Sequence, residues 1–509
     1  RVARNKGGWG EGREQMKQEA GRPCPPAKQP RRRIPKDPTP RFKAPDREAL
    51  ALAERLVPRE HLARRVWRVV ERFELTQVEA RSSALGQNGF APRQLLGLWL
   101  YASLIGLHQG TRLARALQTD CALRWLSGGH CISVAVLNRF RAQNGALFLA
   151  ALEETVRWAV QEGLVRTREL GIDSVRLRAH ASRSQVRVRT QSLRRLKHLR
   201  AVDVDALDAC QRAQHARQVR KHQEAVHLCE QRAQASVVLS NPRAALMQFP
   251  GNGVHPGHRL TVVASGVTQR LVVGVLLTAS GNDKGHLEGA MQQTRRVLHA
   301  AGVPLPLRLQ VAGDSGYWSE EDLRFAALHH ACMDVLLNPG PATGPLATKP
   351  GMLPREAFEL QHARRAVVCP AGRTMHGPVL NHFDRCEVYF GQGCPTCPLR
   401  PQCSQAERRT FTVRWEYEGL LEAMQTRMKQ PDAKARYLQR MATVEPVFAS
   451  LQQDMGFRRL SSRHPPTIDA EVFLKLLAHN VSRLLTRSRL FCVFVLLEAP
   501  ASPPASQPG

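Results

Sequence analysis

A β-strand pattern with one carboxylate in its middle restricts the possible folds of this chain most strongly. In residues 166–180, RTRELGIDSVRLRAH, apolar side chains recur at alternate positions around Asp173. A period of two is typical of a strand, whereas aspartate is disfavoured inside one. Four later segments also have strand patterns: 259–267, 271–280, 307–318 and 333–340. The chain must therefore build a sheet that accepts an acidic group within it.

The order of these patterns predicts a mixed sheet flanked by helices, an α/β fold. The strands at 259–267 and 271–280 are close enough in sequence to pair as a hairpin. A helix predicted over 284–302 separates them from the strand at 307–318, whose end carries Asp314 at a glycine-flanked turn. Because α/β sheets place ligands at the carboxyl ends of their strands, Asp314 is a candidate site residue.

Residues 46–163 have a helical pattern instead, with apolar side chains three and four residues apart. This spacing predicts an all-helical N-terminal domain. Within it, residues 137–141 form a basic segment with an apolar back. That segment fits either a DNA-facing helix or an ordinary solvated helix face.

Composition divides the rest of the chain. Residues 1–45 contain thirteen Lys and Arg against four Asp and Glu, with eight prolines, and are predicted to be a disordered basic arm. A catalytic α/β domain is predicted at 164–340 and 436–490, with a basic helical insertion at 183–250. A loop-rich cysteine insertion is predicted at 341–435 and a C-terminal tail at 491–509.

The charge balance points to nucleic acid. The chain has 74 Lys and Arg against 43 Asp and Glu, a formal net charge of +31, which suits a protein that lies along a phosphate backbone. No apolar run reaches the roughly 20 residues that cross a bilayer, and no secretory signal is visible. We therefore expect a cytoplasmic, nucleoid-associated protein.

A third acidic residue completes a candidate metal site. Glu445 lies in a predicted helix, ARYLQRMATVEPVFASLQQDMGF, together with Tyr437 and Arg440. If Asp173, Asp314 and Glu445 meet at one sheet edge, their hard oxygen ligands suit Mg²⁺ or Mn²⁺ rather than zinc. Cleavage of a phosphodiester is a reaction that two such ions support.

Three segments resemble the DDE transposases of bacterial insertion sequences: GIDSVRLRAHAS, VAGDSGYWSEEDL and YLQRMATVEPVFASLQQDMGFRRL, with LLAHNVSRLL behind them. The similarity runs over roughly residues 46–490. It implies a ribonuclease-H-like sheet, with Asp173 on the first strand, Asp314 just after the fourth and Glu445 on the helix after the fifth. It also implies that the helical N-terminal domain binds DNA.

The resemblance further implies an activity. Asp173, Asp314 and Glu445 would coordinate two Mg²⁺ ions, cut double-stranded DNA at the ends of the element and join those ends to target DNA. Tyr437 and Arg440 would contact DNA near the scissile phosphate, and the enzyme would act as a homo-oligomer.

One departure from the family pattern leaves a second interpretation open. Gln452 stands where related families carry a lysine, and a neutral amide cannot grip a phosphate as a cation does. Arg458 and Arg459 are candidates to take over that role. The alternative is a catalytically decayed, transposase-derived DNA-binding protein, and a nuclease that hydrolyses without strand transfer is a third possibility.

The cysteine insertion suggests a second metal. Cys386, Cys394, Cys397 and Cys403 contain a C-x2-C pair with one thiol on each side, and Cys369 or His382 could replace one ligand. Four thiolates suit a structural Zn²⁺ site, although these spacings fit reduced, unligated thiols equally well.

Overall fold

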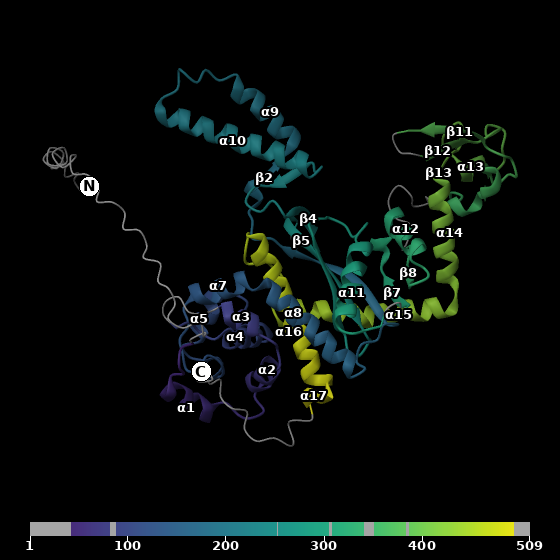
Figure 1. Ribbon diagram of the computed structural model, residues 1–509. Helices are drawn as coiled ribbons and strands as arrows, with labels where there is room; N and C mark the ends of the chain where they lie inside the picture. The colour runs from purple at the N-terminus through teal and green to yellow at the C-terminus, as the bar shows by residue number, and fades with distance from the viewer. Residues whose placement is uncertain are drawn as a thin grey trace, which may run out of the picture.

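The computed structural model describes residues 42–81, 88–251, 253–304, 308–339, 351–382 and 386–492 (Figure 1). The predicted arm at 1–45 and the predicted tail at 491–509 therefore lie almost wholly outside the described residues.

The main sheet of the described chain has six strands in the order β4-β5-β1-β7-β8, with β6 also paired to β5. Its strands are β1 (Leu170–Arg178), β4 (Ala245–Phe249), β5 (Gly253–Ser265), β6 (Leu271–Thr278), β7 (Leu309–Gly313) and β8 (Met333–Leu337). β5 is antiparallel to β1, β4 and β6, whereas β1, β7 and β8 run parallel. This mixed sheet confirms the predicted fold class, and its core order β6-β5-β1-β7-β8 is the ribonuclease-H-like one.

Helices cover both faces of the sheet, because successive residues of a strand pack against helices on opposite faces. In β1, Leu170 and Ile172 pack into one core with α11 (Leu287–Ala300) and α12 (Glu320–Leu328). The intervening Gly171 faces α15 (Pro431–Ala449) on the other side. Asp173, two residues further along β1, shares that second face.

The N-terminal region is helical, as predicted. Its helices are α1 (Arg47–Leu56), α2 (Leu62–Glu71), α3 (Thr76–Arg81), α4 (Pro92–Leu104), α5 (Gly110–Ala116), α6 (Cys121–Leu126), α7 (Val134–Gln143) and α8 (Gly145–Gln161). The long helix α16 (Pro465–Arg487), followed by α17 (Arg489–Cys492), lies between them and the sheet and shares one apolar core with both (Figure 1).

The basic segment at 137–141 lies on α7, and its two arginines differ. Arg139 is exposed, as both interpretations offered above require, whereas Arg141 fits neither. Leu137 and Phe140 are buried, and Arg141 is only 6% exposed. The Arg141 guanidinium donates to the carbonyl oxygen of His108 at 2.8 Å and to Ser461 Oγ at 3.0 Å. This arginine therefore joins the helical region to the segment before α16 and faces neither DNA nor solvent.

The basic insertion forms a helical hairpin that projects from the rest of the molecule (Figure 1). It contains α9 (Arg189–Arg200) and α10 (Ala209–Gln231) above a short sheet of β2 (Val186–Val188) and β3 (Ser236–Val238). One part of the prediction was wrong: residues 245–249, placed in the insertion, form β4 of the main sheet. β4 is as long as β7 and β8, but only two of its residues are buried, against four in each of the others, so its apolar pattern is weaker.

The cysteine segment is more regular than predicted. Its elements are β9 (Glu359–Gln361), β10 (Ala366–Val368), β11 (His376–Asn381), β12 (Cys386–Phe390), β13 (Thr410–Val413), α13 (Arg400–Cys403) and α14 (Trp415–Lys429). β9 and β10 pair with each other, and β11, β12 and β13 form a second small sheet. Strands of three to six residues leave little periodicity in the sequence, which is why this region looked loop-rich.

No helix in the described part of the chain combines the length and the apolar character needed to span a membrane.

Candidate active site

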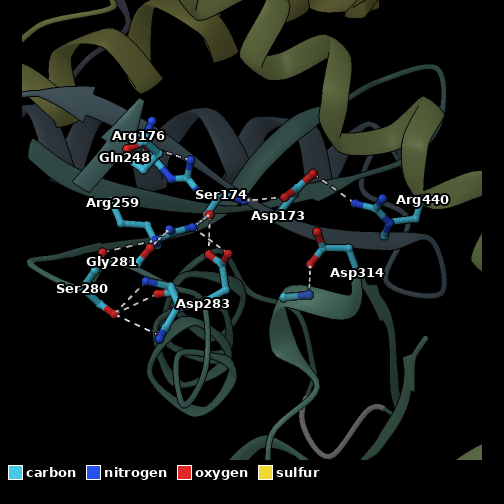
Figure 2. Close-up of polar contacts among 12 residues, drawn as sticks. Asp173, Ser174, Arg176, Gln248, Arg259, Ser280, Gly281, Asp283, Asp314 and Arg440 are labelled. Atoms are coloured by element: carbon cyan, nitrogen blue, oxygen red, sulfur yellow. Dashed lines mark hydrogen bonds and ion pairs between the residues drawn. The ribbon is translucent and has the colours of Figure 1, made fainter. Parts of the chain in front are cut away.

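Strand register brings two predicted carboxylates side by side. In the parallel β1–β7 pair, Ile172 lies opposite Gly313. Asp173 therefore comes next in β1, and Asp314 comes directly after the end of β7. Figure 2 shows both side chains in the same site. This register follows from the burial of the apolar strand residues, because a shift of one residue would turn each side chain to the opposite face.

The two aspartates lie in a poorly solvated environment. The pKa of Asp173 is raised to about 6, first by burial and then by the neighbouring charge of Asp314, against the lowering effects of the Ser174 N–H and of Arg440. Burial also raises the pKa of Asp314, while the Gly316 N–H, which donates to Asp314 Oδ1 at 3.0 Å, lowers it. A pair of buried carboxylates with raised pKa values is an arrangement that a bound cation stabilises.

Arg440 on α15 connects Asp173 to the third predicted acid. Its guanidinium is 8% exposed; Nη1 lies 3.0 Å from Asp173 Oδ2 and Nη2 lies 3.9 Å from Glu445 Oε1. The Glu445 side chain is 49% exposed, so it lies at the rim of the site and not within it. One arginine therefore separates Glu445 from the aspartates.

A glycine permits this approach of α15 to the sheet. A Cβ atom at Gly171 would lie 3.3 Å from Thr443 Cβ and 3.4 Å from the carbonyl oxygen of Arg440. A larger side chain at this position would push α15 away from β1. Arg440 and Glu445, which belong to this helix, would move with it.

The other predicted DNA-contacting residues lie around this site. Tyr437 packs against a small cluster of Ala312, Leu336 and Ala433, with the Arg440 guanidinium 5.9 Å from its ring centroid. Arg458 and Arg459 are exposed on a segment that pairs with Arg178 at the end of β1.

Gln452, the departure from the family pattern, lies near the same segment. It belongs to the π-helical turn Ser450–Asp454 that follows α15, and its carbonyl oxygen accepts from Arg458 Nε at 3.2 Å. The structure thus places an arginine against the backbone of Gln452.

Sequence reasoning missed an ion pair beside the two aspartates. Asp283, in the loop after β6, pairs with Arg259 of β5 and accepts a hydrogen bond from Ser174 (Figure 2). A signal was available, because β6 runs in the same direction as β1 and an acid just after it lies at the edge where β1 and β7 end.

Comparison with known families gives two matches. Residues 52–143 match the family model described as Transposase domain (DUF772), and residues 368–485 match the one described as Transposase DDE domain. Two segments of this chain are thus similar to transposase domains. The resemblance inferred from sequence is thereby confirmed, although nothing shows an origin in a bacterial insertion sequence. No curated protein and no solved structure matches the chain.

Only some of the site residues lie within the segments that match transposase families. The DUF772 match runs from α1 to α7, within the N-terminal helices. The DDE match begins at the end of β10 and contains α15 with Arg440 and Glu445, whereas Asp173 and Asp314 precede it. The structure therefore supplies the connection between the matched helix and the two strand aspartates.

The cysteines of the DDE match gather in a set that differs from the predicted one. Cys369, Cys394, Cys397 and Cys403 line one pocket, whereas Cys386 lies on β12 beside a second cavity that His382 also lines. Burial raises the pKa of the Cys403 thiol, and the other three pocket cysteines raise it further. Of the predicted set, Cys386 therefore lies apart from the other three, and Cys369, the alternative ligand, lines their pocket.

Neither candidate metal site is closed. Across the residues that the structure describes, no group of three or more His, Cys, Asp or Glu side chains is arranged to hold a metal ion. At the carboxylates, Glu445 is turned toward Arg440, so of the three predicted acids only the two aspartates lie together.

Proposed function

We propose that this protein is a DDE transposase, which binds the DNA ends of a mobile element and catalyses metal-dependent cleavage and strand transfer. One observation carries the proposal above the others: the strand register places buried Asp173 beside Asp314, under a helix that belongs to a Transposase DDE domain match. The mixed sheet provides the scaffold for such a site.

Each residue of the site has a role in this proposal. Asp173, Asp314 and Glu445 would hold Mg²⁺ or Mn²⁺, with Glu445 turning from Arg440 toward the aspartates. Divalent cations at such a site activate the attacking oxygen and stabilise charge on the leaving one. Arg440 keeps Asp173 ionised and, when a metal replaces it there, is free to contact a DNA phosphate.

The test is a cleavage assay on labelled duplexes that carry the DNA on either side of the coding region. With Mg²⁺ we expect nicks at one position near each end, followed by joined products when target DNA is added. Cleavage without joined products would favour a hydrolytic nuclease instead.

Gln452 supports a second candidate, a decayed transposase that still binds DNA ends. In that case the duplexes would be bound without being cut, and Gln452→Lys should restore cutting if the loss of this cation is what inactivated the enzyme. Retention of cleavage by the natural chain would exclude this candidate and would fit a role for the adjacent Arg458.

The helical hairpin α9–α10 provides a DNA-binding surface in this proposal. Seven of its basic side chains are exposed and, among the described residues, none forms an ion pair with an acid: Arg194, Arg195, Lys197, Arg200, Arg212, Arg217 and Arg220. The buried Leu196, Leu199, Ala225 and Cys229 hold its two helices together. Cations on a rigid, projecting element suit contacts with a phosphate backbone.

We predict that Arg194→Ala combined with Arg195→Ala weakens DNA binding and lowers its salt dependence. Each lost phosphate contact reduces the slope of log K against log salt by about 1, so the double variant should lose up to about 2 units of slope. Fluorescence anisotropy from low to moderate salt measures it. Arg364→Ala, at an exposed position of the cysteine segment, is the control and should keep the natural slope. Equal slopes for all three proteins would remove the hairpin from the interface.

We also propose that the cysteine pocket holds a structural zinc ion through Cys369, Cys394, Cys397 and Cys403. Two turns support this set: the Cys369 N–H donates to the Arg373 carbonyl at 2.9 Å, and the Cys397 N–H donates to the Cys394 carbonyl at 3.2 Å. Cys369 and the Cys394–Cys397 pair thus lie at tight turns around one pocket, which Cys403 at the end of α13 also lines. Binding would draw the four sulfur atoms into a tetrahedral arrangement.

For this site we predict about one zinc ion per purified chain, by elemental analysis, because four thiolates form a closed tetrahedral set. Cys369→Ser should lower the zinc content to near zero, whereas Cys386→Ser should leave it unchanged. The opposite result would reinstate the set that the sequence suggested, and a zinc-free natural protein would dismiss the site.

A further inference from the structure

A buried ion pair lies on the far side of β1 from Arg440. Because successive residues of a strand face opposite ways, Asp173 points toward α15, and Ser174 points toward the loop between β6 and α11. In that loop, Asp283 accepts from Ser174 Oγ through Oδ1 and from Arg259 Nη1 through Oδ2 at 2.6 Å (Figure 2). Both of its carboxylate oxygens are thus engaged, which argues against a metal-ligand role.

Arg259 is bound on every side. Its side chain is 3% exposed, and Nη1 also donates to Ser174 Oγ at 2.8 Å. Its Nε donates to the carbonyl oxygen of Ser280 at 3.3 Å, and Nη2 donates to that of Gly281. A buried guanidinium that lacks its carboxylate partner is strongly unfavourable, so Arg259 fixes Asp283 and the loop that carries it.

The same carboxylate contacts the turn that carries Asp314. A Cβ atom at Gly316 would lie 2.9 Å from Asp283 Oδ2 and 2.9 Å from Asp314 Oδ1. The two carboxylates therefore flank one glycine of the turn Ser315–Tyr317. Asp283 thus reaches the residue after Asp173 on one side and the turn after Asp314 on the other.

We propose that Arg259, Asp283 and Ser174 form a positioning cluster that sets the separation between Asp173 and Asp314 and so tunes the affinity of the site for divalent cations. This inference rests on the proposed function, because it assigns the cluster to that same carboxylate site. The three residues act through the strand and the turn and do not touch the metal or the DNA.

The test compares Asp283→Asn with Asp334→Asn in the full chain. Asp334 also pairs with arginines of this domain, the half-buried Arg427 at 2.9 Å and Arg436 at 2.5 Å, but it lies at the opposite end of β8 from the site. Manganese binding without DNA, followed by electron paramagnetic resonance, is the first measurement. Rates and DNA affinity on the flanking duplexes are the second.

We expect Asp283→Asn to raise the Mn²⁺ concentration for half-saturation about tenfold and to lower the cleavage rate constant 10- to 100-fold, the usual range for outer-shell partners of a metal site. Its DNA dissociation constant should stay within about twofold of the natural value, since the cluster makes no DNA contact. Asp334→Asn should bind manganese normally. Ser174→Ala, which removes a single hydroxyl group, should give a smaller shift in the same direction.

Other outcomes distinguish a failure of the positioning role from a failure of the proposed transposase function. If Asp283→Asn binds manganese and cuts as the natural protein does, the positioning role is overturned while the transposase proposal stands. If Asp334→Asn is impaired equally, the effect is one of general stability and the inference also fails. If Asp283→Asn does not fold, an unshifted Ser174→Ala overturns it. A natural protein that binds no manganese overturns both proposals.

Discussion

Asp314→Asn should abolish DNA cleavage and leave DNA binding within about twofold of the natural affinity. Charge stabilisation by bound metal amounts to several kcal/mol, so we expect the rate to fall at least about a thousandfold. The substitution is nearly isosteric and retains an oxygen that accepts from the Gly316 N–H. End cleavage and anisotropy on the same duplexes measure the two effects separately.

The same variant should be no less stable than the natural protein when metal is absent. Burial raises the pKa of Asp314, and the charge of Asp314 raises that of Asp173, so a neutral amide removes an unfavourable charge. We expect a gain of about 0.5–2 kcal/mol in the free energy of unfolding, as for other relieved functional sites. Mg²⁺ should raise the melting temperature of the natural protein only. A destabilised variant that still cuts would contradict the assignment.

Arg440→Ala should move the acidic limb of the cleavage pH profile to higher pH. Arg440 lowers the pKa of Asp173 through its charge and its 3.0 Å hydrogen bond. Without Arg440, the pKa of Asp173 rises above about 6, so a larger fraction of Asp173 is protonated at neutral pH. The protonated carboxyl group cannot bind a metal ion. We expect at least a tenfold loss of rate at pH 7, with partial recovery near pH 8.5. Arg440→Lys should lie between the two proteins, because it keeps the charge but not the fork of donors.

The stability of the metal-free protein should change with pH in a matching way. Asp173 titrates at about 6 in the folded chain against an ordinary value of 3.8, so the folded state holds its proton more tightly. This contribution to stability is present below pH 3.8 and is lost as pH rises through about 6. In Arg440→Ala the loss should extend to higher pH.

Arg436→Ala is the matched control for these measurements. It removes an arginine from the same helix, one turn earlier, whose partner is Asp334 and not Asp173. It should lower stability without moving the pH profile. A profile shifted equally by both substitutions would show that the position of α15, and not the charge of Arg440, controls the site.

Sequence predicted much of the fold because its signals are local. The strand patterns, the β5–β6 hairpin and the helical N-terminal region all follow from periodicity over short windows. Failures occurred where the apolar pattern of a strand is weak, as in β4, or where a side chain's partner is distant, as for Arg141 with Ser461. Local patterns do not report which residues will be buried together.

The candidate site shows the same division. The unusual aspartate inside a strand pattern and the aspartate at a strand end identified Asp173 and Asp314. Asp283 was missed because it lies five residues beyond the end of β6, and its contact with Ser174 forms only in the folded chain. Spacing also did not show that Cys386 lies apart from Cys394, Cys397 and Cys403, because it does not report which way a strand directs its side chains.

The sequence by itself thus determined the acidic residues, the order of strands and helices and the basic character of the chain, since each is fixed by residue type and local spacing. Only the tertiary structure decided that Asp173 and Asp314 are neighbours, that Arg440 lies between Asp173 and Glu445, and that Arg259 and Asp283 lie behind them. Those relations depend on parallel register and on the close approach of α15 at Gly171, in which residues far apart in the chain are held together by shared burial.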